Sequence, residues 1–248
     1  MKEIQAGYQN EFNFVLAFNN KQIKNLDPLL REVIDDLYPG INEYCVVKSW
    51  RNHINNEKAD IFVKVDGYIR TISIKMGSRN SVHVESLTSF IDLLNKNNIN
   101  KSVINDYCLY HYGINKDKRR LTSKEYCELN EDKIKKINNE FKKIDSKIIA
   151  ERFLLNGNNS EYQIDGIIYG TPNDFLWINK HDIIKIIERT WNKTSNSVHL
   201  GCLFIQPLNR CINENKKYLW MRDYIQIKWY SLFDDILDFK NNKNNYAI

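Results

Sequence analysis

The sequence predicts an α/β core of about ninety residues, followed by an α+β extension. Two observations carry this prediction. The turn sequence Asp66-Gly67 lies between two runs of β-branched and aromatic residues, as in a β-hairpin. Apolar residues at helical spacing lie before and after this hairpin. The expected order is helix, strand, strand, strand, helix, with residues 1–100 as the core and residues 101–248 as the extension.

The elements of the core follow in chain order. An opening helix is predicted by the helical spacing of Tyr8, Phe12, Val15 and Leu16. A second helix is predicted to end at Pro39-Gly40, and residues 45–50 are predicted to form the first strand. After the hairpin, residues 77–81 suit a tight turn and a helix N-cap, and residues 81–95 carry a helical apolar stripe.

The extension alternates further helices and strands. Thr122 and Glu125 have the spacing of a capping box, which predicts the start of a helix. Asp165-Gly166 is interpreted as a turn, and the residues after Phe239 as a frayed tail. Four further elements are predicted: a helix over 131–153, a strand over 162–169, a helix over 180–191 and a buried strand over 198–206.

Pairing the hairpin strands outward from the turn places Asp60 directly opposite Ser73, with the two Cβ atoms about 5 Å apart. Alternation puts Lys75 on the same face, while Ile61 and Ile74 point the other way into a core. A carboxylate and an ammonium group on one polar patch suit metal-assisted attack on a phosphodiester.

This arrangement resembles the PD-(D/E)XK nuclease superfamily. The resemblance rests on Asp60 and Ser73-Ile74-Lys75, preceded by a helix that carries Glu11 and followed by a helix, and it covers roughly residues 5 to 95. It implies a restriction-endonuclease-like core, with a central mixed sheet flanked by helices. It also implies a catalytic Asp60 that binds Mg²⁺, for which Mn²⁺ substitutes, and a catalytic Lys75 that positions or activates water.

The sequence departs from the family pattern at two positions. Ala59 stands where the family has proline, and Ser73 stands where it usually has a second acid. Glu85, expected one turn into the following helix, is the first candidate to replace this acid as a metal ligand. Glu11 is the second, because the resemblance places a glutamate of the opening helix near the metal. For each glutamate, a solvated helix surface is the alternative interpretation.

Three groups of residues are candidates for binding DNA. Phosphate contacts are expected from a polar turn at a helix N-terminus, formed by Ser78, Arg79, Asn80 and Ser81. A basic loop containing Arg119 and Arg120 suits a polyanion backbone. Side chains suited to adenine and guanine follow a buried strand at Gln206, Asn209 and Arg210. A helix cap, a solvated charged face and a strand-ending turn are the respective alternatives.

Composition limits the function classes. A net charge of +5 is compatible with a polyanionic partner. Five cysteines without a Cys-x-x-Cys pair indicate free thiols rather than a disulfide framework or a zinc ribbon. The chain shows no apolar signal region, membrane-spanning stretch, Walker loop or Gly-x-Ser-x-Gly elbow. A cytoplasmic protein without a membrane partner is therefore expected.

Two main hypotheses follow. In the first, the chain is a Mg²⁺-dependent, type II restriction-like endonuclease that hydrolyses double-stranded DNA, and residues 101–248 supply target recognition or homodimer contacts. In the second, it is a catalytically inactive DNA-recognition module of the same fold, as the neutral Ser73 favours. A structural or interaction protein, whose hairpin is an ordinary ribbon with a polar outer face, is the third interpretation.

Overall fold

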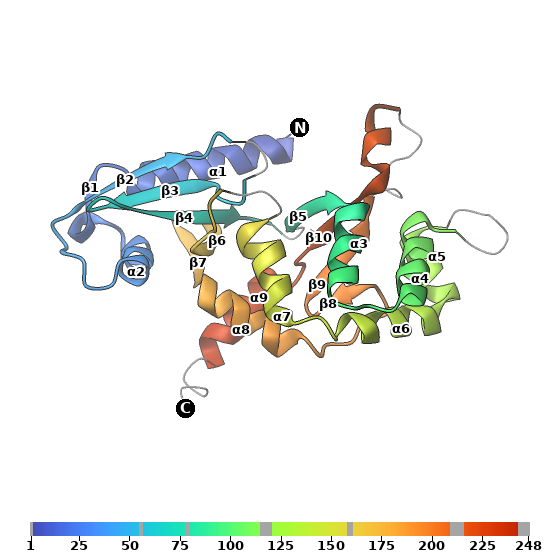
Figure 1. The fold of residues 1–248 in the computed structure, drawn as a ribbon. Helices are drawn as coiled ribbons and strands as arrows, with labels where there is room; N and C mark the ends of the chain where they lie inside the picture. Colours follow the sequence, from blue (N-terminus) through green and yellow to red (C-terminus); the bar gives the residue numbers. More distant parts are fainter. Residues whose placement is uncertain are drawn as a thin grey trace. The chain divides into compact units, whose positions relative to one another are not determined.

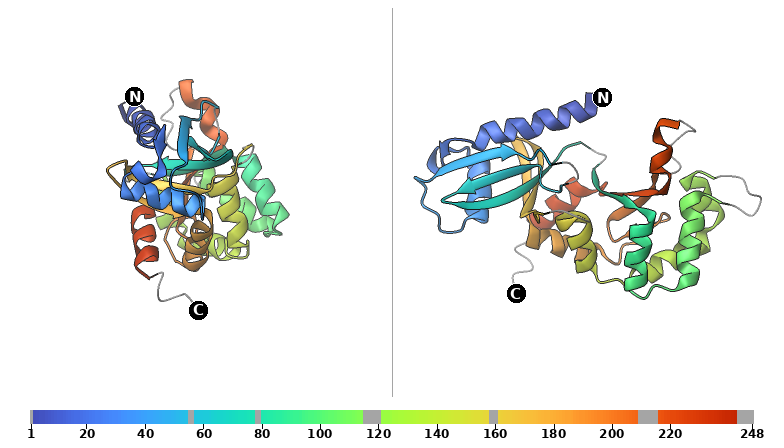
Figure 2. Two further views of the ribbon diagram at one scale, coloured as in Figure 1. Left: turned by 90° about the vertical axis from the view of Figure 1, so that its left-hand side faces the viewer. Right: turned by 45° about the horizontal axis from the view of Figure 1, so that its top comes forward.

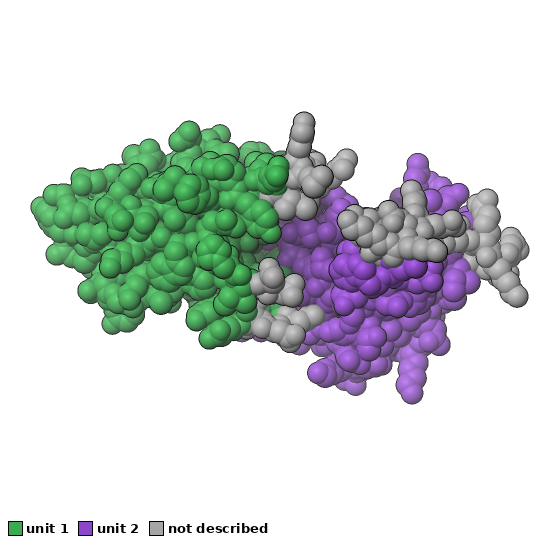
Figure 3. Space-filling view, turned by 90° about the horizontal axis from the view of Figure 1, so that it is seen from above, with its two compact units in different colours: residues 1–78, 154–186, 231–248 green, residues 79–153, 187–230 purple. Residues whose placement is uncertain are grey.

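A computed structural model describes residues 2–54, 57–77, 80–114, 121–157, 161–208 and 216–242. The chain folds as two compact units, coloured separately in Figure 3. Unit 1 contains residues 1–78, 154–186 and 231–248, and unit 2 contains residues 79–153 and 187–230. Residue 100, at which the sequence suggested a division, is not a boundary between the units, because unit 1 takes segments from both sides of it.

Unit 1 is built on a mixed sheet (Figure 1). Within the described residues its strands lie in the order β1-β2-β3-β4-β6-β7, and only β4 and β6 are parallel neighbours. The strands are β1 (Lys21–Gln22), β2 (Val46–Arg51), β3 (Ile61–Val65), β4 (Tyr68–Lys75), β6 (Gly166–Thr171) and β7 (Asp174–Asn179). Strands β6 and β7 come from the predicted extension, so the sheet is completed by residues far along the chain.

The β3–β4 hairpin has the predicted register. Asp66 and Gly67 form its turn with φ angles of 48° and 86°, the positive values that a type I′ turn requires. Val65 pairs with Tyr68, and the pairing continues residue by residue to Ile61 opposite Ile72. The Asp60 amide then donates to the Ile72 carbonyl oxygen at 2.9 Å. The prediction that Asp60 lies beside Ser73 is therefore confirmed.

Two helices cover one face of this sheet: α1 (Lys2–Phe18) and α2 (Pro28–Leu37), joined through the short 3-10 helix η1 (Ile23–Asn25). Phe14, Val15 and Phe18 of α1 pack into a core with alternate residues of the strands. The predicted apolar face of α1 is wrong in part, because Tyr8, Phe12 and Leu16 are exposed and only Val15 of the four predicted residues is buried. The buried face includes Phe14, whose ring meets Phe175 of β7 at 5.5 Å.

Helix α9 (Leu232–Asn242) packs against β7, and both views of Figure 2 show it on the opposite side of the sheet from α1. The interpretation of the chain after Phe239 as a frayed tail is wrong as far as Asn242, because this helix continues to that residue. Phe233 of α9 contacts Tyr169 of β6 with ring centroids 5.7 Å apart. Part of the second sheet face is therefore covered by the carboxyl-terminal segment.

Unit 2 contains an antiparallel sheet in the order β5-β10-β9-β8. Its strands are β5 (Ser81–Ser86), β8 (His199–Leu200), β9 (Leu203–Pro207) and β10 (Tyr224–Lys228). Helices α3 (Leu87–Lys96), α4 (Lys101–Tyr112), α5 (Ser123–Leu129), α6 (Glu131–Phe141) and α7 (Ser146–Ala150) also belong to it, as does the 3-10 helix η4 (Lys216–Asp223). The π-helix η2 (Glu151–Asn156) and α8 (Lys180–Thr190) complete the described elements.

Several predictions for unit 2 are corrected. The helix expected from Ser81 begins at Leu87, where the Ser86 hydroxyl accepts from the Ser89 amide, and the preceding residues form β5 instead. The helix expected over 131–153 is broken, because Asp145 caps a new helix. The strand expected over 198–206 is two strands, β8 and β9, around Gly201, which has a φ of 59°. The Thr122–Glu125 capping box is confirmed.

The described cysteines at 45, 108, 127 and 202 form no disulfide. No described helix is both long enough and apolar enough to cross a bilayer.

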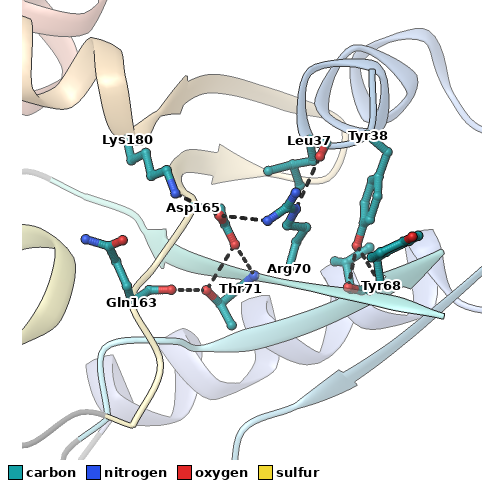
Figure 4. Close-up of polar contacts among 9 residues, drawn as sticks. Leu37, Tyr38, Tyr68, Arg70, Thr71, Gln163, Asp165 and Lys180 are labelled. Carbon is teal, nitrogen blue, oxygen red and sulfur yellow. Dashed lines mark hydrogen bonds and ion pairs between the residues drawn. The ribbon is translucent and has the colours of Figure 1, made fainter. Parts of the chain in front are cut away.

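Asp165 joins β4 to β6, as Figure 4 shows. Its Oδ2 atom accepts from the Thr71 amide at 3.0 Å, and its own amide donates to the Thr71 carbonyl oxygen at 2.8 Å. Its Oδ1 atom lies 3.7 Å from Arg70 Nη1 and 3.5 Å from Lys180 Nζ. Gly166, interpreted with Asp165 as a turn, instead begins β6. A Cβ atom there would lie 2.2 Å from the Trp177 ring, so only glycine fits.

We expect Asp165→Ala to lower the free energy of unfolding by roughly 2–3 kcal/mol, because the Thr71 amide and two cations lose their acceptor. Urea denaturation followed by tryptophan fluorescence measures the change. Asp174→Ala is the control, since Asp174 is exposed at the start of β7, and its effect should stay within about 0.5 kcal/mol. Equal losses in the two variants would show that Asp165 does not hold the strands together.

Candidate active site

The Asp60 carboxylate lies where β3 ends beside β4. Its Oδ2 atom accepts hydrogen bonds from Ser73 Oγ at 2.8 Å, the Ile74 amide at 2.6 Å and Lys75 Nζ at 3.4 Å. If β3 were longer, a backbone carbonyl oxygen of that strand would accept from the Ile74 amide. The Asp60 carboxylate takes the place of that acceptor. Asp60 therefore completes the strand ladder with one carboxylate oxygen, while Oδ1 accepts no hydrogen bond from the described residues.

Ser73 and Lys75 hold Asp60 from the neighbouring strand. Ser73 is only 3% exposed, and its hydroxyl donates to the carboxylate. A carboxylate at this position would face Asp60 as a like charge, whereas the hydroxyl satisfies it without repulsion. Lys75 is partly buried and supplies the positive charge of the pair. The hairpin therefore presents one carboxylate, one hydroxyl and one ammonium group.

Glu11 of α1 is an acid whose pKa is affected by the charges of this site. Burial raises the pKa of Glu11, and the negative charge of Asp60 raises it further, while Arg51 and Lys75 act in the opposite direction. The carboxyl group of Glu11 therefore lies within the electrostatic field of both hairpin residues. Of the two glutamates proposed to replace the missing acid, Glu11 is the one whose pKa is affected by the charges of Asp60 and Lys75, and its hydrogen bond is to Arg51.

Arg51 orients Glu11, and the sequence analysis missed it. Glu11 Oε2 lies 3.0 Å from both Nε and Nη2 of Arg51, so one carboxylate oxygen receives two donors. The Arg51 guanidinium also lies 4.9 Å from the centroid of the Tyr8 ring. A signal was present, because Arg51 alternates with the buried Val47 along β2 and so points toward the same helix.

Glu85 occupies a different environment from the one predicted. It lies on β5 rather than on a helix, is 2% exposed, and contacts Arg152 Nη2 at 2.6 Å and His83 Nε2 at 3.5 Å. Burial opposes its ionisation, but His83 and Arg152 outweigh burial and lower the pKa of the carboxyl group. Both partners belong to unit 2, so Glu85 is part of a buried ionic cluster of that unit.

Several predicted DNA contacts lie outside the described residues, namely Ser78, Arg79, Arg119, Arg120, Asn209 and Arg210. Asn80 is buried, and its carbonyl oxygen accepts from the Trp229 amide. Ser81 lies on β5 and accepts from Gln226 Nε2 at 2.8 Å, so it does not form a helix N-terminus as expected. Gln206 lies on β9 directly opposite Gln226.

The donor set around Asp60 fits a hard divalent cation. Asp60 Oδ1 and Glu11 Oε1 accept no hydrogen bond from the described residues, so each has lone pairs available. The described part of the chain holds no cluster of three or more histidine, cysteine or acidic residues suited to a metal. Mg²⁺ does not need one, because it commonly takes one or two carboxylates and completes its shell with phosphate oxygens and water.

The raised pKa of Glu11 predicts a pH dependence of stability. Its ordinary pKa is 4.5, and a raised value means that the folded chain favours the protonated group. Glu11 therefore contributes fully to the free energy of unfolding below pH 4.5. This contribution is lost as the pH rises through the pKa that Glu11 has in the folded chain. We expect the difference in unfolding free energy between wild type and Glu11→Gln to fall as pH rises, measured by urea denaturation with a chelator.

Glu140→Gln is the matched control. A hydrogen bond with Lys143 lowers the pKa of Glu140, so the corresponding difference should rise as pH rises toward 4.5, below the interval in which Glu11 acts. A rising difference for Glu11→Gln as well would contradict the raised pKa of Glu11.

Comparisons with known proteins bear on the fold. No family model matches the chain, and no curated protein matches it. Among solved structures, the chain is similar to the restriction endonuclease MspI in complex with its cognate DNA. That match has a TM-score of 0.59 and 11% sequence identity, and it covers 90% of this chain and 88% of that chain. The predicted fold class is confirmed, and the chain has a mixed α/β restriction-endonuclease-like fold.

Proposed function

We propose that this chain is a Mg²⁺-dependent endodeoxyribonuclease of the type II restriction kind, acting on double-stranded DNA. The observation that carries the proposal is the Asp60 carboxylate, held by Ser73 and Lys75 with the acid Glu11 in its electrostatic field. The fold supports it, because the similar solved structure is a restriction endonuclease in complex with DNA. A phosphodiester is the substrate to which this set of charges is suited.

In the proposed reaction a water oxygen attacks phosphorus, the bond from phosphorus to the leaving sugar oxygen breaks, and that oxygen takes up a proton. Asp60 Oδ1 and Glu11 Oε1 would hold Mg²⁺, which lowers the pKa of bound water and neutralises phosphate charge. Lys75 Nζ donates a hydrogen bond toward the attacking water or the developing charge on phosphorus. Ser73 and the Ile74 amide keep the Asp60 carboxylate oriented throughout.

Ser73 determines where the second acid must come from. The hairpin carries one carboxylate, so a two-acid metal shell requires a residue from another element. In the proposal Glu11 supplies this acid from α1, and its hydrogen bond with Arg51 supports a fixed orientation of the carboxylate. In this proposal Glu11 replaces the acid that the family usually carries at the position of Ser73.

The second candidate function is a DNA-recognition module without catalysis, and the neutral Ser73 is the observation that favours it. Such a module would bind DNA with strong salt dependence and leave it intact in Mg²⁺ or Mn²⁺. Two further proposals concern partners. The chain forms a homodimer, and Gln206 of β9 contacts bases of the DNA target.

We expect the purified protein to cleave supercoiled plasmid DNA in Mg²⁺ and to stop when the metal is chelated. Asp60→Ala and Lys75→Ala should each lower the cleavage rate by about 100-fold or more, because each removes a charge from the reacting centre. Asp174→Ala and Lys185→Ala are the matched controls, since both residues are exposed. Asp174 begins β7, the last strand in the order of the described sheet, and Lys185 lies on α8. Gel electrophoresis of time courses gives the rates.

Two outcomes decide between the candidate functions. Intact DNA after incubation of wild type with a varied DNA panel in both metals, together with salt-sensitive binding, would establish the recognition module. Full cleavage by Asp60→Ala would remove the assigned site.

The choice of Glu11 as second acid has its own test. Glu11→Gln should raise the Mg²⁺ concentration for half-maximal cleavage by tenfold or more, since even the loss of an outer-shell partner costs about 10–100-fold. Glu43→Gln is the control, because Glu43 is a surface acid that pairs with Arg31. An unchanged Mg²⁺ requirement in Glu11→Gln would exclude Glu11 from the metal shell.

A further inference from the structure

Two lysines lie directly opposite each other on unit 1. Lys48 of β2 pairs with Lys64 of β3, so their side chains leave the sheet on the same face. This face is the reverse of the one that packs on α1, because the neighbouring residues Val47 and Val63 point into that core. Lys48 is exposed and Lys64 is half-buried. Two positive charges therefore converge on one point of a sheet surface.

No acid neutralises this pair among the described residues. The polar contacts of the described part of the chain give neither Lys48 nor Lys64 a hydrogen bond or an ion pair. Directly opposed like charges destabilise a strand pair. The arrangement therefore costs the isolated protein stability, and an anion placed between the two ammonium groups would relieve that cost.

An aromatic pair forms a wall beside the lysines. Trp50 follows Lys48 by two residues on β2 and stacks on Phe62 of β3, with ring centroids 5.5 Å apart and planes within 15°. Phe62 is in turn held by the edge of Tyr162 at 5.2 Å. Trp50 keeps 39% of its surface exposed. The lysine pair and the stacked aromatic pair are therefore neighbours on the same two strands.

Strand β3 links the lysine pair to the candidate active site. Asp60 directly precedes this strand, and Phe62 and Lys64 lie on it. Four residues separate Asp60 from Lys64, which corresponds to about 13 Å at roughly 3.3 Å per residue. A duplex carries a phosphate on each strand about every 3.4 Å along its axis, so one DNA molecule can reach both points.

We propose that Lys48 and Lys64 form a phosphate-binding site for the DNA backbone, on β2 and on β3, the strand that follows Asp60. The proposal rests on the proposed function for the identity of the polyanion, and on charge complementarity for the contact itself. Phosphate contacts of this kind give affinity and orientation without reading sequence. The lysine pair would hold the duplex at a second point, so that the phosphodiester bond to be cleaved stays beside Asp60 and Lys75.

The test compares Lys48→Gln/Lys64→Gln with Lys101→Gln/Lys185→Gln, a double variant of two exposed lysines on α4 and α8. Binding of a fluorescent random-sequence duplex is measured by anisotropy in Ca²⁺ at several salt concentrations. We expect the first variant to bind roughly tenfold more weakly at about 0.1 M salt, with a log–log salt slope shallower by about two. The second variant should bind like wild type.

Urea denaturation of both double variants separates binding from folding. Removal of the opposed charges should leave the denaturation midpoint of Lys48→Gln/Lys64→Gln equal to or above that of wild type. An unchanged affinity and salt slope in that variant would overturn the phosphate site, as would an equal loss of affinity in the control. A lysine pair that binds only an acidic protein would give the same overturning result with DNA.

Failure of this inference is distinguishable from failure of the proposed function. Lysine-dependent DNA binding by a wild type that never cleaves DNA would retain the phosphate site and remove the nuclease. If wild type cleaves DNA and Lys48→Gln/Lys64→Gln binds DNA normally, the nuclease is retained and the phosphate site is removed. Absence of DNA binding by wild type would overturn both.

Discussion

The hydrogen bond from the Ile74 amide to the Asp60 carboxylate is the contact on which the site depends. A buried amide needs an acceptor, and at the end of β3 the backbone no longer provides one. The side chain of Asp60 takes that role, so the strands separate without leaving an unpaired amide. Because one oxygen is committed to the sheet, the direction of the other is determined by the fold. The residue that ends the ladder is therefore also the residue held rigidly enough to bind a ligand.

The side-chain charges around Asp60 balance one another. Asp60 and Glu11 contribute two negative charges when ionised, and Lys75 and Arg51 contribute two positive charges. Serine at position 73 preserves this balance, since a third acid would leave the cluster negative. A divalent cation would then make the cluster positive, which favours a phosphate. Burial is the main cause of the raised pKa of Glu11, and the charge of Asp60 adds to it, while Arg51 and Lys75 act in the opposite direction.

Local and distant interactions explain which features could be predicted. The register of the hairpin depends on the Asp66-Gly67 turn, so the contact of Asp60 with Ser73 followed from sequence spacing alone. Residues Ser81–Ser86 were predicted to be helical because their apolar spacing continues into α3. They form a strand because they pair with β10, some 140 residues later in the chain. Glu85 was therefore misplaced, and Arg51 was missed because its partner lies on another element.

The parallel pairing of β4 with β6 has a consequence for how the protein is made. Lys75 is followed by about ninety residues before the chain returns with β6 to the same sheet. At a synthesis rate of roughly 5–20 residues per second, β4 waits several seconds on the ribosome for its parallel neighbour. During that interval Asp60, Ser73 and Lys75 have already been synthesised, but β4 has no neighbouring strand on the side where β6 later pairs. The protein is thus most exposed to incorrect strand pairing just before its sheet is completed.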